Sequence, residues 1–493
     1  MTTMNTLPTQ PLKPGLVHFP GSTPESTALV AELLHKDYVA HHCFHNDQNF
    51  SNHLSHHILS LHDLGAPIEW IRAMYEKEAA TQRPLHLNGV PDKASTIDET
   101  NWKSHLGKQN ALRYPDYLSF FSREIGKHGV SATLERYVFS PEANANGTFM
   151  LARFIGSLLH PIIETGLGLE FGQDFMIAQG LSQAALAAPV AAGVMHEESG
   201  LPQIQSGAQS ATLLSLLREL YDSPELAPAP YETQQLTPER LSKWTASNPA
   251  GAAAIRAIYA KWTFDINLQD PTASDVHFAA KVEECMWQAT LLLGATGKRD
   301  RAPRMDFYLM HFLTGSLFLG VVVDALKSPL HKAQLLHAYV RSAALFVILR
   351  GRPRIDPALV MSYPVASPTP TGTAAESKTP NPNSGSPWLA LLNNATMHTE
   401  PHVVKSIRML FYCAQKYGAT PAGGVIGALA SDGARKGEET ETHKGAAGLD
   451  GTLFVRVAGK MTDAVGWVVC GEGERFWDFG GIGWDEAWRE EDA

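Results

Sequence analysis

The chain has 493 residues, of which 44% are hydrophobic and 18% are charged, so it can bury a large core and is not intrinsically disordered. Its net charge of -10 provides no basic field, and we expect neither nucleic acid nor a membrane surface as a partner. Four cysteines without a CxxC pair argue against a disulfide scaffold and indicate a reducing compartment.

The first residues lack the apolar core of a signal peptide and the arginines of a transit peptide, so we expect a cytoplasmic location.

Helical patterns dominate the chain. Apolar residues recur with helical spacing over residues 52–64, 68–77, 117–127, 149–163, 278–293, 306–326, 331–349 and 402–416. Residues 451–457 and 466–470 are short exceptions that alternate like strands. The fold class predicted is mainly α.

The organisation predicted is a large single multi-helical domain, residues 1–493, with long surface loops. Residues 361–387 are so rich in Pro, Ser, Thr and Gly that they predict a disordered loop, and residues 434–451 predict a flexible one. No linker separates two self-sufficient parts, although a division near residues 225–250 is an alternative.

One segment, FYLMHFLTGSLFLGVVV at residues 307–323, is 17 residues long without a formal charge. It is slightly short for a membrane span and contains polar residues. We therefore interpret it as a helix buried in a large helical core.

Histidines are concentrated near the N-terminus, where residues 41–67 hold seven of the 21 in the chain. His53 and His57 are spaced i, i+4, so a helix would place both imidazoles on one face, which suits a metal ion. The sequence does not choose firmly among His53, His56 and His57. The alternative is a set of buried histidines that bind backbone carbonyls.

Two more histidines, His160 and His311, lie in segments that we expect to be buried. Pro161 is expected to bend its helix and leave a carbonyl close to His160. A buried neutral imidazole needs a partner for each nitrogen, and a metal with an additional acceptor meets that need. A carbonyl and a hydroxyl would meet it equally.

A fourth place is ATMHTEPHVVKSIRML, where Pro401 suits the first position of a helix and Thr399 or Glu400 suits its cap. His402 then lies in the first turn, with Lys405 on the same face. Lys405 could extend to solvent. Alternatively, beside a metal, its neutral amine could take up CO2 and provide a carbamate oxygen as a ligand.

These positions together predict a buried metal site with His53, His57, His160, His311, His402 and Lys405 as the candidate ligands. Imidazoles with one oxygen ligand suit iron, and suit zinc less well, because catalytic zinc usually has three protein ligands. Iron with an open position can activate O2.

The ordered motifs resemble the questin oxidase-like family of fungal polyketide enzymes, often described as Baeyer-Villiger oxidases. The matching stretches are NHLSHHILSLHDLGA (52–66), LHPIIETGLGLE (159–170), RMDFYLMHFLTGSL (304–317), HVVKSIRML (402–410) and FWDFGGIGWDEAW (476–488). The resemblance implies oxidative cleavage of an anthraquinone-type ring, and it covers residues 50–488.

The expected activity is that of an oxidoreductase, a nonheme Fe(II)-dependent oxygenase with O2 as co-substrate in fungal secondary metabolism. No GxGxxG follows a strand, so we expect no flavin. NADPH is a candidate electron source, directly or through a separate reductase, and the oligomeric state is left open. Thr314 could orient oxygen or the substrate, or simply bind the Met310 carbonyl. Glu164 could act as a base or hold a ligand histidine, or be solvated.

The C-terminal motif places aromatic residues around Gly480, Gly481 and Gly483 and predicts a tight turn. Its aromatic residues could line a flat pocket, but a packed C-terminal lock is the preferred interpretation. Two other functions stay open for the chain: a zinc-dependent hydrolase or lyase with the same histidines, and a non-catalytic helical binding protein.

Overall fold

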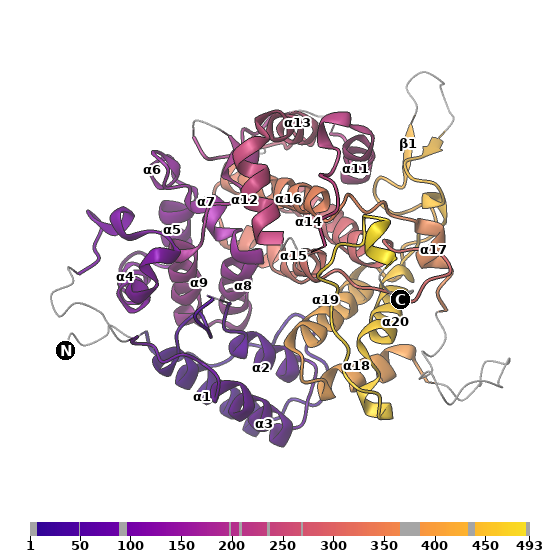
Figure 1. Cartoon of the computed structure of the whole chain (residues 1–493). Helices are drawn as coiled ribbons and strands as arrows, with labels where there is room; N and C mark the ends of the chain where they lie inside the picture. The colour runs from indigo at the N-terminus through magenta and orange to yellow at the C-terminus, as the bar shows by residue number, and fades with distance from the viewer. Residues whose placement is uncertain are drawn as a thin grey trace. The chain divides into compact units, whose positions relative to one another are not determined.

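Helices form most of the structure. The computed structural model describes residues 7–48, 50–87, 96–196, 199–206, 210–233, 237–267, 270–364, 385–431 and 439–489. Within them the one sheet is a pair of short antiparallel strands, β1 (Leu429–Ser431) and β2 (Glu439–Glu441). The mainly α prediction is confirmed (Figure 1). Residues 365–384 of the predicted 361–387 loop lie outside the described residues.

Two compact units share the chain, and each takes several segments of it. The first unit comprises Met1–Ile204, Ile266–Ser274 and Phe318–Ser342. The second comprises Gln205–Asp265, Asp275–Leu317 and Ala343–Ala493. The segments of the two units alternate along the sequence, so the boundary between the units is not a single cut near residues 225–250.

The first unit holds the N-terminal helices. They are α1 (Pro24–Ala40), α2 (Leu54–Asp63), α3 (Ile68–Ala79), α4 (Tyr114–His128), α5 (Val130–Leu134), α6 (Pro141–Asn144), α7 (Met150–Phe154), α8 (His160–Phe171), α9 (Asp174–Leu186) and α10 (Ala192–Met195). Short 3₁₀ segments η1 (Trp102–His105), η2 (Lys108–Arg113) and η4 (Ser157–Leu159) and a π segment η3 (Glu135–Phe139) connect them.

At the centre of the first unit, α8 packs against α9. The helix α9 also packs against α4 and α7. Glycines allow the close approach: a Cβ on Gly180 would lie 2.2 Å from the Thr165 hydroxyl oxygen, and one on Gly168 would lie 2.8 Å from Ile177. The helix α2 contacts α1, α3 and α8. The start of α8, at His160, lies beside the start of α2, at His53.

The predicted helix over residues 149–163 is wrong in its continuity. After α7, three consecutive non-glycine residues, Ser157, Leu158 and Leu159, adopt left-handed φ angles of 48°, 54° and 65°. This breaks the helix, and α8 begins anew at His160. Pro161 therefore begins a helix instead of bending one, because the first turn needs no N–H from that residue.

The second unit holds the C-terminal helices. They are α11 (Leu213–Asp222), α12 (Thr237–Ser247), α13 (Pro249–Tyr259), α17 (Pro357–Met361), α18 (Pro387–Met397), α19 (Pro401–Tyr417) and α20 (Leu453–Val465). Short 3₁₀ segments are η5 (Pro224–Leu226), η6 (Ala446–Gly448), η7 (Val468–Cys470) and η8 (Glu486–Trp488). Three long helices, α14 (Pro271–Gly294), α15 (Phe307–Ala325) and α16 (Pro329–Leu349), contribute residues to both units.

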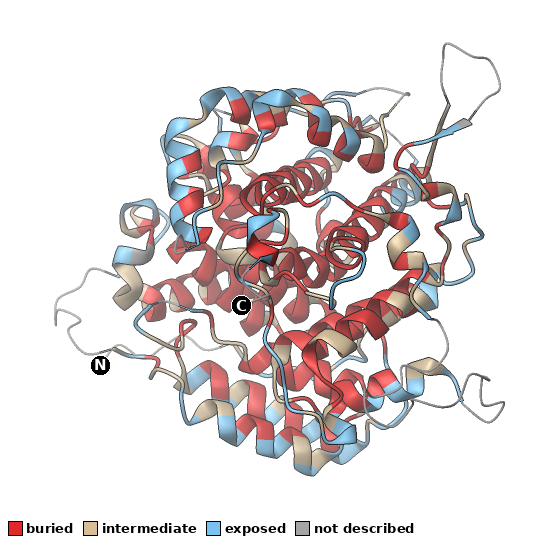
Figure 2. Cartoon of the chain, turned by 45° about the vertical axis from the view of Figure 1, so that its right-hand side comes forward, coloured by how far each residue is buried: buried red, intermediate tan, exposed pale blue. Residues whose placement is uncertain are grey.

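The apolar segment of residues 307–323 lies in α15. By length and composition it could cross a membrane, but 78% of its apolar window is buried inside the fold. Figure 2 shows how far burial extends through the long helices. The segment fits the expected core helix.

Two strand predictions near the C-terminus are wrong. Residues 451–457 enter α20, and residues 466–470 contain η7. The apolar side chains Leu453, Val457, Met461 and Val465 recur every four residues. This spacing favours a helix over the strand that the alternation within residues 451–457 predicted. The described part of the predicted 434–451 loop contains β2 and η6.

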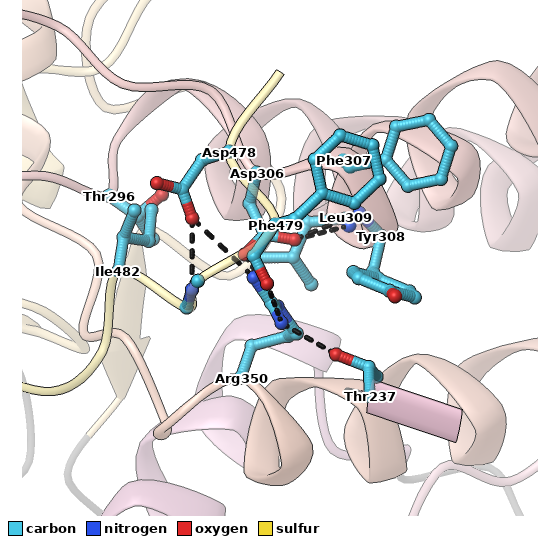
Figure 3. A network of polar contacts seen from close by, with 12 residues as sticks. Thr237, Thr296, Asp306, Phe307, Tyr308, Leu309, Arg350, Asp478, Phe479 and Ile482 are labelled. Atoms are coloured by element: carbon cyan, nitrogen blue, oxygen red, sulfur yellow. Dashed lines mark hydrogen bonds and ion pairs between the residues drawn. The ribbon is translucent and has the colours of Figure 1, made fainter. Parts of the chain in front are cut away.

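The C-terminal segment fixes the start of α15 (Figure 3). Asp306 accepts hydrogen bonds from the backbone N–H groups of Tyr308 at 2.9 Å and Leu309 at 3.0 Å. Its other oxygen accepts from Arg350 Nε at 2.7 Å, and both side chains are fully buried. Asp478 joins the network through an ion pair with Arg350 at 3.5 Å.

Candidate functional site

In the first unit, His53 and His160 face each other. Their Nε2 atoms are 2.9 Å apart and their rings are nearly perpendicular. His53 occupies the N-cap position of α2, and His160 is the first residue of α8. The packing of α2 against α8 therefore brings together residues that are 107 positions apart in the sequence.

Backbone carbonyls fix the tautomer of both rings. His53 Nδ1 contacts the carbonyl oxygen of Ser51 at 2.7 Å, and His160 Nδ1 contacts that of Ser157. A carbonyl oxygen can only accept, so each Nδ1 carries the hydrogen and each neutral ring presents a lone pair at Nε2. Two lone pairs at 2.9 Å repel each other unless a proton or a cation interacts with both.

The separation of these nitrogens also tests the fit of a metal. Two imidazole nitrogens about 2.1 Å from one ion lie roughly 3.0 Å apart at a right angle and roughly 3.4 Å apart at the tetrahedral angle. The observed 2.9 Å agrees with the right angle, which six-coordinate metals use. An Nδ1–H donated to an oxygen acceptor is also the usual arrangement of a histidine ligand. The separation of the two nitrogens is thus compatible with two ligands of one metal ion.

Next to this pair, His56 is held by Glu164. The His56 ring is stacked over His160 with a centroid separation of 6.1 Å, and its Nε2 lies 2.9 Å from a Glu164 carboxylate oxygen. The same oxygen accepts from the Ser55 hydroxyl at 2.8 Å. Glu164 is buried and is therefore not the solvated surface residue of the alternative interpretation.

The structure does not bring His57 to this pair. Its Nδ1 forms a short contact with a carboxylate oxygen of Glu78 on α3, and its side chain is fully buried. His53 precedes α2, so the i, i+4 spacing does not create the expected shared helical face. Among the three neighbouring histidines, His53 and His56 lie beside His160.

A second histidine pair lies in the second unit. His311 on α15 and His402 on α19 have ring centroids 4.8 Å apart. His311 Nδ1 contacts the Phe307 carbonyl at 2.8 Å, and His402 Nδ1 contacts a Glu400 carboxylate oxygen at 2.5 Å. Both rings therefore donate from Nδ1 to oxygen, as in the first pair, and each neutral ring presents its lone pair at Nε2.

Glu400 connects the start of α19 to the C-terminal motif. It is the N-cap residue, it accepts from the backbone N–H groups of His402 and Val403, and Pro401 follows it in the first turn, as predicted. Its second oxygen accepts from Trp477 Nε1 at 2.8 Å. Together with Trp488, which is only 2% exposed, these contacts support the predicted C-terminal lock.

The remaining predicted site residues lie on the same two helices. Lys405 is buried on α19, three residues after His402, so it does not extend to solvent. Thr314 is buried on α15 and donates its hydroxyl to the His311 carbonyl at 3.2 Å, not to that of Met310. The functional roles of Lys405 and Thr314 stay predictions.

Aromatic rings lead outward from the second pair. Phe307 lies 4.7 Å from His311 and 5.3 Å from His402 between ring centroids. Phe479 stacks on Phe307 with a centroid separation of 4.4 Å and is 52% exposed. Sequence reasoning did not assign a role to Phe307 or to Glu78. Phe307 could have been found from its position one turn before His311, but the partner of His57 depends on packing.

Comparison with known proteins identifies one family and several related fungal enzymes. Residues 50–410 match the model of the questin oxidase-like family. A Baeyer-Villiger oxidase of Pestalotiopsis microspora is 30% identical over 61% of this chain and 65% of its own length, and is thus matched over less than two thirds. The questin oxidase of Aspergillus terreus is 26% identical over 77% of this chain and 78% of its own. An oxidoreductase of Aspergillus parasiticus is 25% identical over 71% of this chain and 68% of its own length.

These relatives bear on the site in two ways. Their names indicate an oxidoreductase. The matched region includes every predicted metal and catalytic residue, from His53 to Lys405. It ends at residue 410, so the C-terminal motif at 476–488, one of the five stretches that carry the resemblance, lies outside it.

Proposed function

Because the chain belongs to the questin oxidase-like family, we propose that it is a nonheme iron-dependent oxygenase. Its proposed reaction is the cleavage of a ring of an anthraquinone-type polyketide with O2, in fungal secondary metabolism. The relatives named questin oxidase and Baeyer-Villiger oxidase support the reaction class. The observation that supports a bound metal is the 2.9 Å separation of the His53 and His160 Nε2 atoms.

The proposed ligands are His53, His160, His311 and His402. Each pair is defined within its own unit, and the proposal is that both pairs bind one ferrous ion. Support comes from their common chemistry, because all four rings donate from Nδ1 to an oxygen acceptor. His57 is left out of this set, because the ring that faces His160 Nε2 is that of His53.

The chemistry that bound iron supplies is the activation of O2, which reacts very slowly with organic molecules by itself. The chain would supply the rest. Ser51, Ser157 and Phe307 hold three imidazoles through their carbonyls, and Glu400 holds the fourth through its carboxylate. This support fixes the direction of each Nε2. Glu164 beside His56 would accept a proton from a phenolic hydroxyl of the substrate or orient that histidine.

The substrate class fits the aromatic rings near the second pair. A flat polycyclic ring could stack on Phe479, which is half-exposed and itself stacks on Phe307 beside His402. Offset or edge contacts between aromatic rings contribute about 0.5–1.5 kcal/mol each beyond burial. Such contacts orient a planar substrate without requiring charged groups.

Lys405 has a distinct proposed role. We place it as the oxygen ligand of the same ion, after its neutral amine attacks CO2, forms an N–C bond and releases one proton. Its burial one turn from His402 supports this role, because a buried ammonium group beside a cation is costly. Intact mass of the native protein, measured with and without bicarbonate, tests it: a gain equal to CO2 that Lys405→Met abolishes is the expected result.

Dioxygen dependence tests the proposed activity. Purified protein with iron, NADPH and a panel of hydroxyanthraquinones should open the ring in air and not under argon. With isotopically labelled O2, one labelled atom in the product together with NADPH oxidation indicates that the second atom leaves as water. Two labelled atoms without NADPH oxidation indicate a dioxygenase. Turnover under argon would instead favour a zinc-dependent hydrolase or lyase, and metal-free protein without turnover would favour a binding protein.

A further inference from the structure

A cavity of about 320 Å³ in the second unit has a cationic lining. Its charged lining residues, all in the described part of the chain, are Lys298, Arg352 and Arg354, and no acidic residue lines it. These three cations lie in a chain whose net charge is -10, and two of them, Lys298 and Arg354, are paired with carboxylates outside the lining. The proposed oxygenase chemistry does not use the cavity.

The cations are arranged around the cavity by groups outside its lining. Lys298 pairs with Asp485 at 2.5 Å, and Arg354 pairs with Asp222 at 3.2 Å. Arg352 donates to the Ser223 carbonyl at 2.8 Å. Burial lowers the pKa of Arg352 below its ordinary value, the positive charge of Arg354 lowers it further, and Asp222 and Tyr221 partly offset this. An anion bound in the cavity would offset the remaining repulsion.

The backbone at Arg352 is also unusual. The end of α16 forms a Schellman motif, in which Arg352 N–H binds the Val347 carbonyl at 2.8 Å and Gly351 N–H binds that of Ile348 at 3.1 Å. This motif explains the left-handed φ of 85° at Gly351, where a Cβ would lie 2.5 Å from Trp484. It does not require the next residue to be left-handed, yet Arg352 has a φ of 55°. Such strain in a non-glycine residue is concentrated at functional sites.

We propose that this cavity binds the phosphate group of a small metabolite. Guanidinium groups bind phosphate oxygens through two parallel hydrogen bonds, and a lysine adds a point charge. The volume exceeds what one phosphate needs, so the cavity can accept a diphosphate or the first part of an organic phosphate. The site is independent of the histidine pairs.

Calorimetric titration of the full chain with inorganic pyrophosphate, ADP and adenosine tests this site. We expect pyrophosphate to bind with a Kd below about 1 mM. Arg352→Asn removes the guanidinium while asparagine tolerates a left-handed backbone, and it should weaken binding roughly tenfold or more, as should Arg354→Gln. Arg299→Gln is the matched control, because this exposed arginine pairs with Asp356 and does not line the cavity.

The ligands distinguish the source of the phosphate. Binding of ADP at least as tightly as pyrophosphate, without binding of adenosine, indicates an organic phosphate. Binding of pyrophosphate alone indicates a free phosphate. Either result supports the site. Absence of pyrophosphate binding to the wild-type chain, equal binding of adenosine and ADP, or unchanged binding in folded Arg352→Asn protein would overturn it. Iron content should be unchanged in all three variants.

Discussion

His53 and His160 present their Nε2 atoms to each other at 2.9 Å, while the Nδ1 of each ring donates to a backbone carbonyl. This arrangement is unfavourable for two neutral imidazoles and favourable for two ligands of one ion. The local backbone that creates it is itself strained, because His160 follows three left-handed residues. Both features are costs to folding that a bound metal would offset.

The left-handed turn before His160 can be tested at Ser157. Ser157→Val should lower the free energy of unfolding by about 1–2 kcal/mol, because a β-branched residue is strongly disfavoured at a φ of 48°. Ser157→Gly, which accepts this backbone and keeps the carbonyl, should be neutral or stabilising by up to about 1 kcal/mol. Chemical denaturation of the three proteins measures both effects. Equal stability of the valine and glycine variants would argue against the turn.

Glu400 should control how tightly His402 binds metal. Glu400→Gln replaces a carboxylate that accepts from His402 Nδ1 and should weaken iron affinity roughly tenfold to a hundredfold. Trp477→Phe keeps the ring and removes only the hydrogen bond to the other Glu400 oxygen, so its effect should be smaller. Competition with a chelator gives the relative affinities. An equal loss in both variants would indicate general damage to the segment.

Phe479 should affect substrate binding and leave the metal unchanged. Phe479→Ala should raise KM for a hydroxyanthraquinone roughly threefold to tenfold, with kcat and iron content little changed, and Phe479→Tyr should restore KM. Phe476→Ala is the matched control, since this phenylalanine lies in the same segment and is 94% exposed. Similar changes in KM for both alanine variants would contradict a specific role of Phe479.

His42 should make the stability of the protein depend on pH. Burial lowers its pKa from 6.5 to about 4, and it is held neutral between the Ala111 carbonyl and the Phe44 N–H group. The unfolded chain therefore binds more protons between these values, and stability falls as pH decreases from 6.5 toward 4. The contribution is on the order of 3 kcal/mol. His42→Gln should flatten this part of the pH profile of the unfolding free energy, and an unchanged profile would contradict the assignment.

The sequence predicted the helices that carry the second histidine pair better than the segments around the first. Periodic apolar residues located α15 and α19, and Pro401 with Glu400 located the start of α19. The break before His160 could not be predicted, because three left-handed residues with side chains persist only under tertiary constraint.

The choice between His53 and His57 was equally inaccessible. It depends on His160, a residue 107 positions from His53 whose ring reaches it only after α2 and α8 pack, whereas His57 meets Glu78 on α3. His56 depends in the same way on Glu164, which lies on α8. Local spacing can indicate that a histidine suits a metal, but it does not show which competing partner the fold supplies.

Elemental analysis of untagged protein tests the central claim most directly. We expect about one iron ion per chain, lost in His160→Gln and equally in His311→Gln, and retained in His57→Asn, whose amide nitrogen takes the place of Nδ1 and can still donate to Glu78. Equal losses from the two units would mean that both pairs hold the same ion. Two ions per chain with half lost in each variant, zinc in place of iron, or folded and active protein without metal would contradict the proposal.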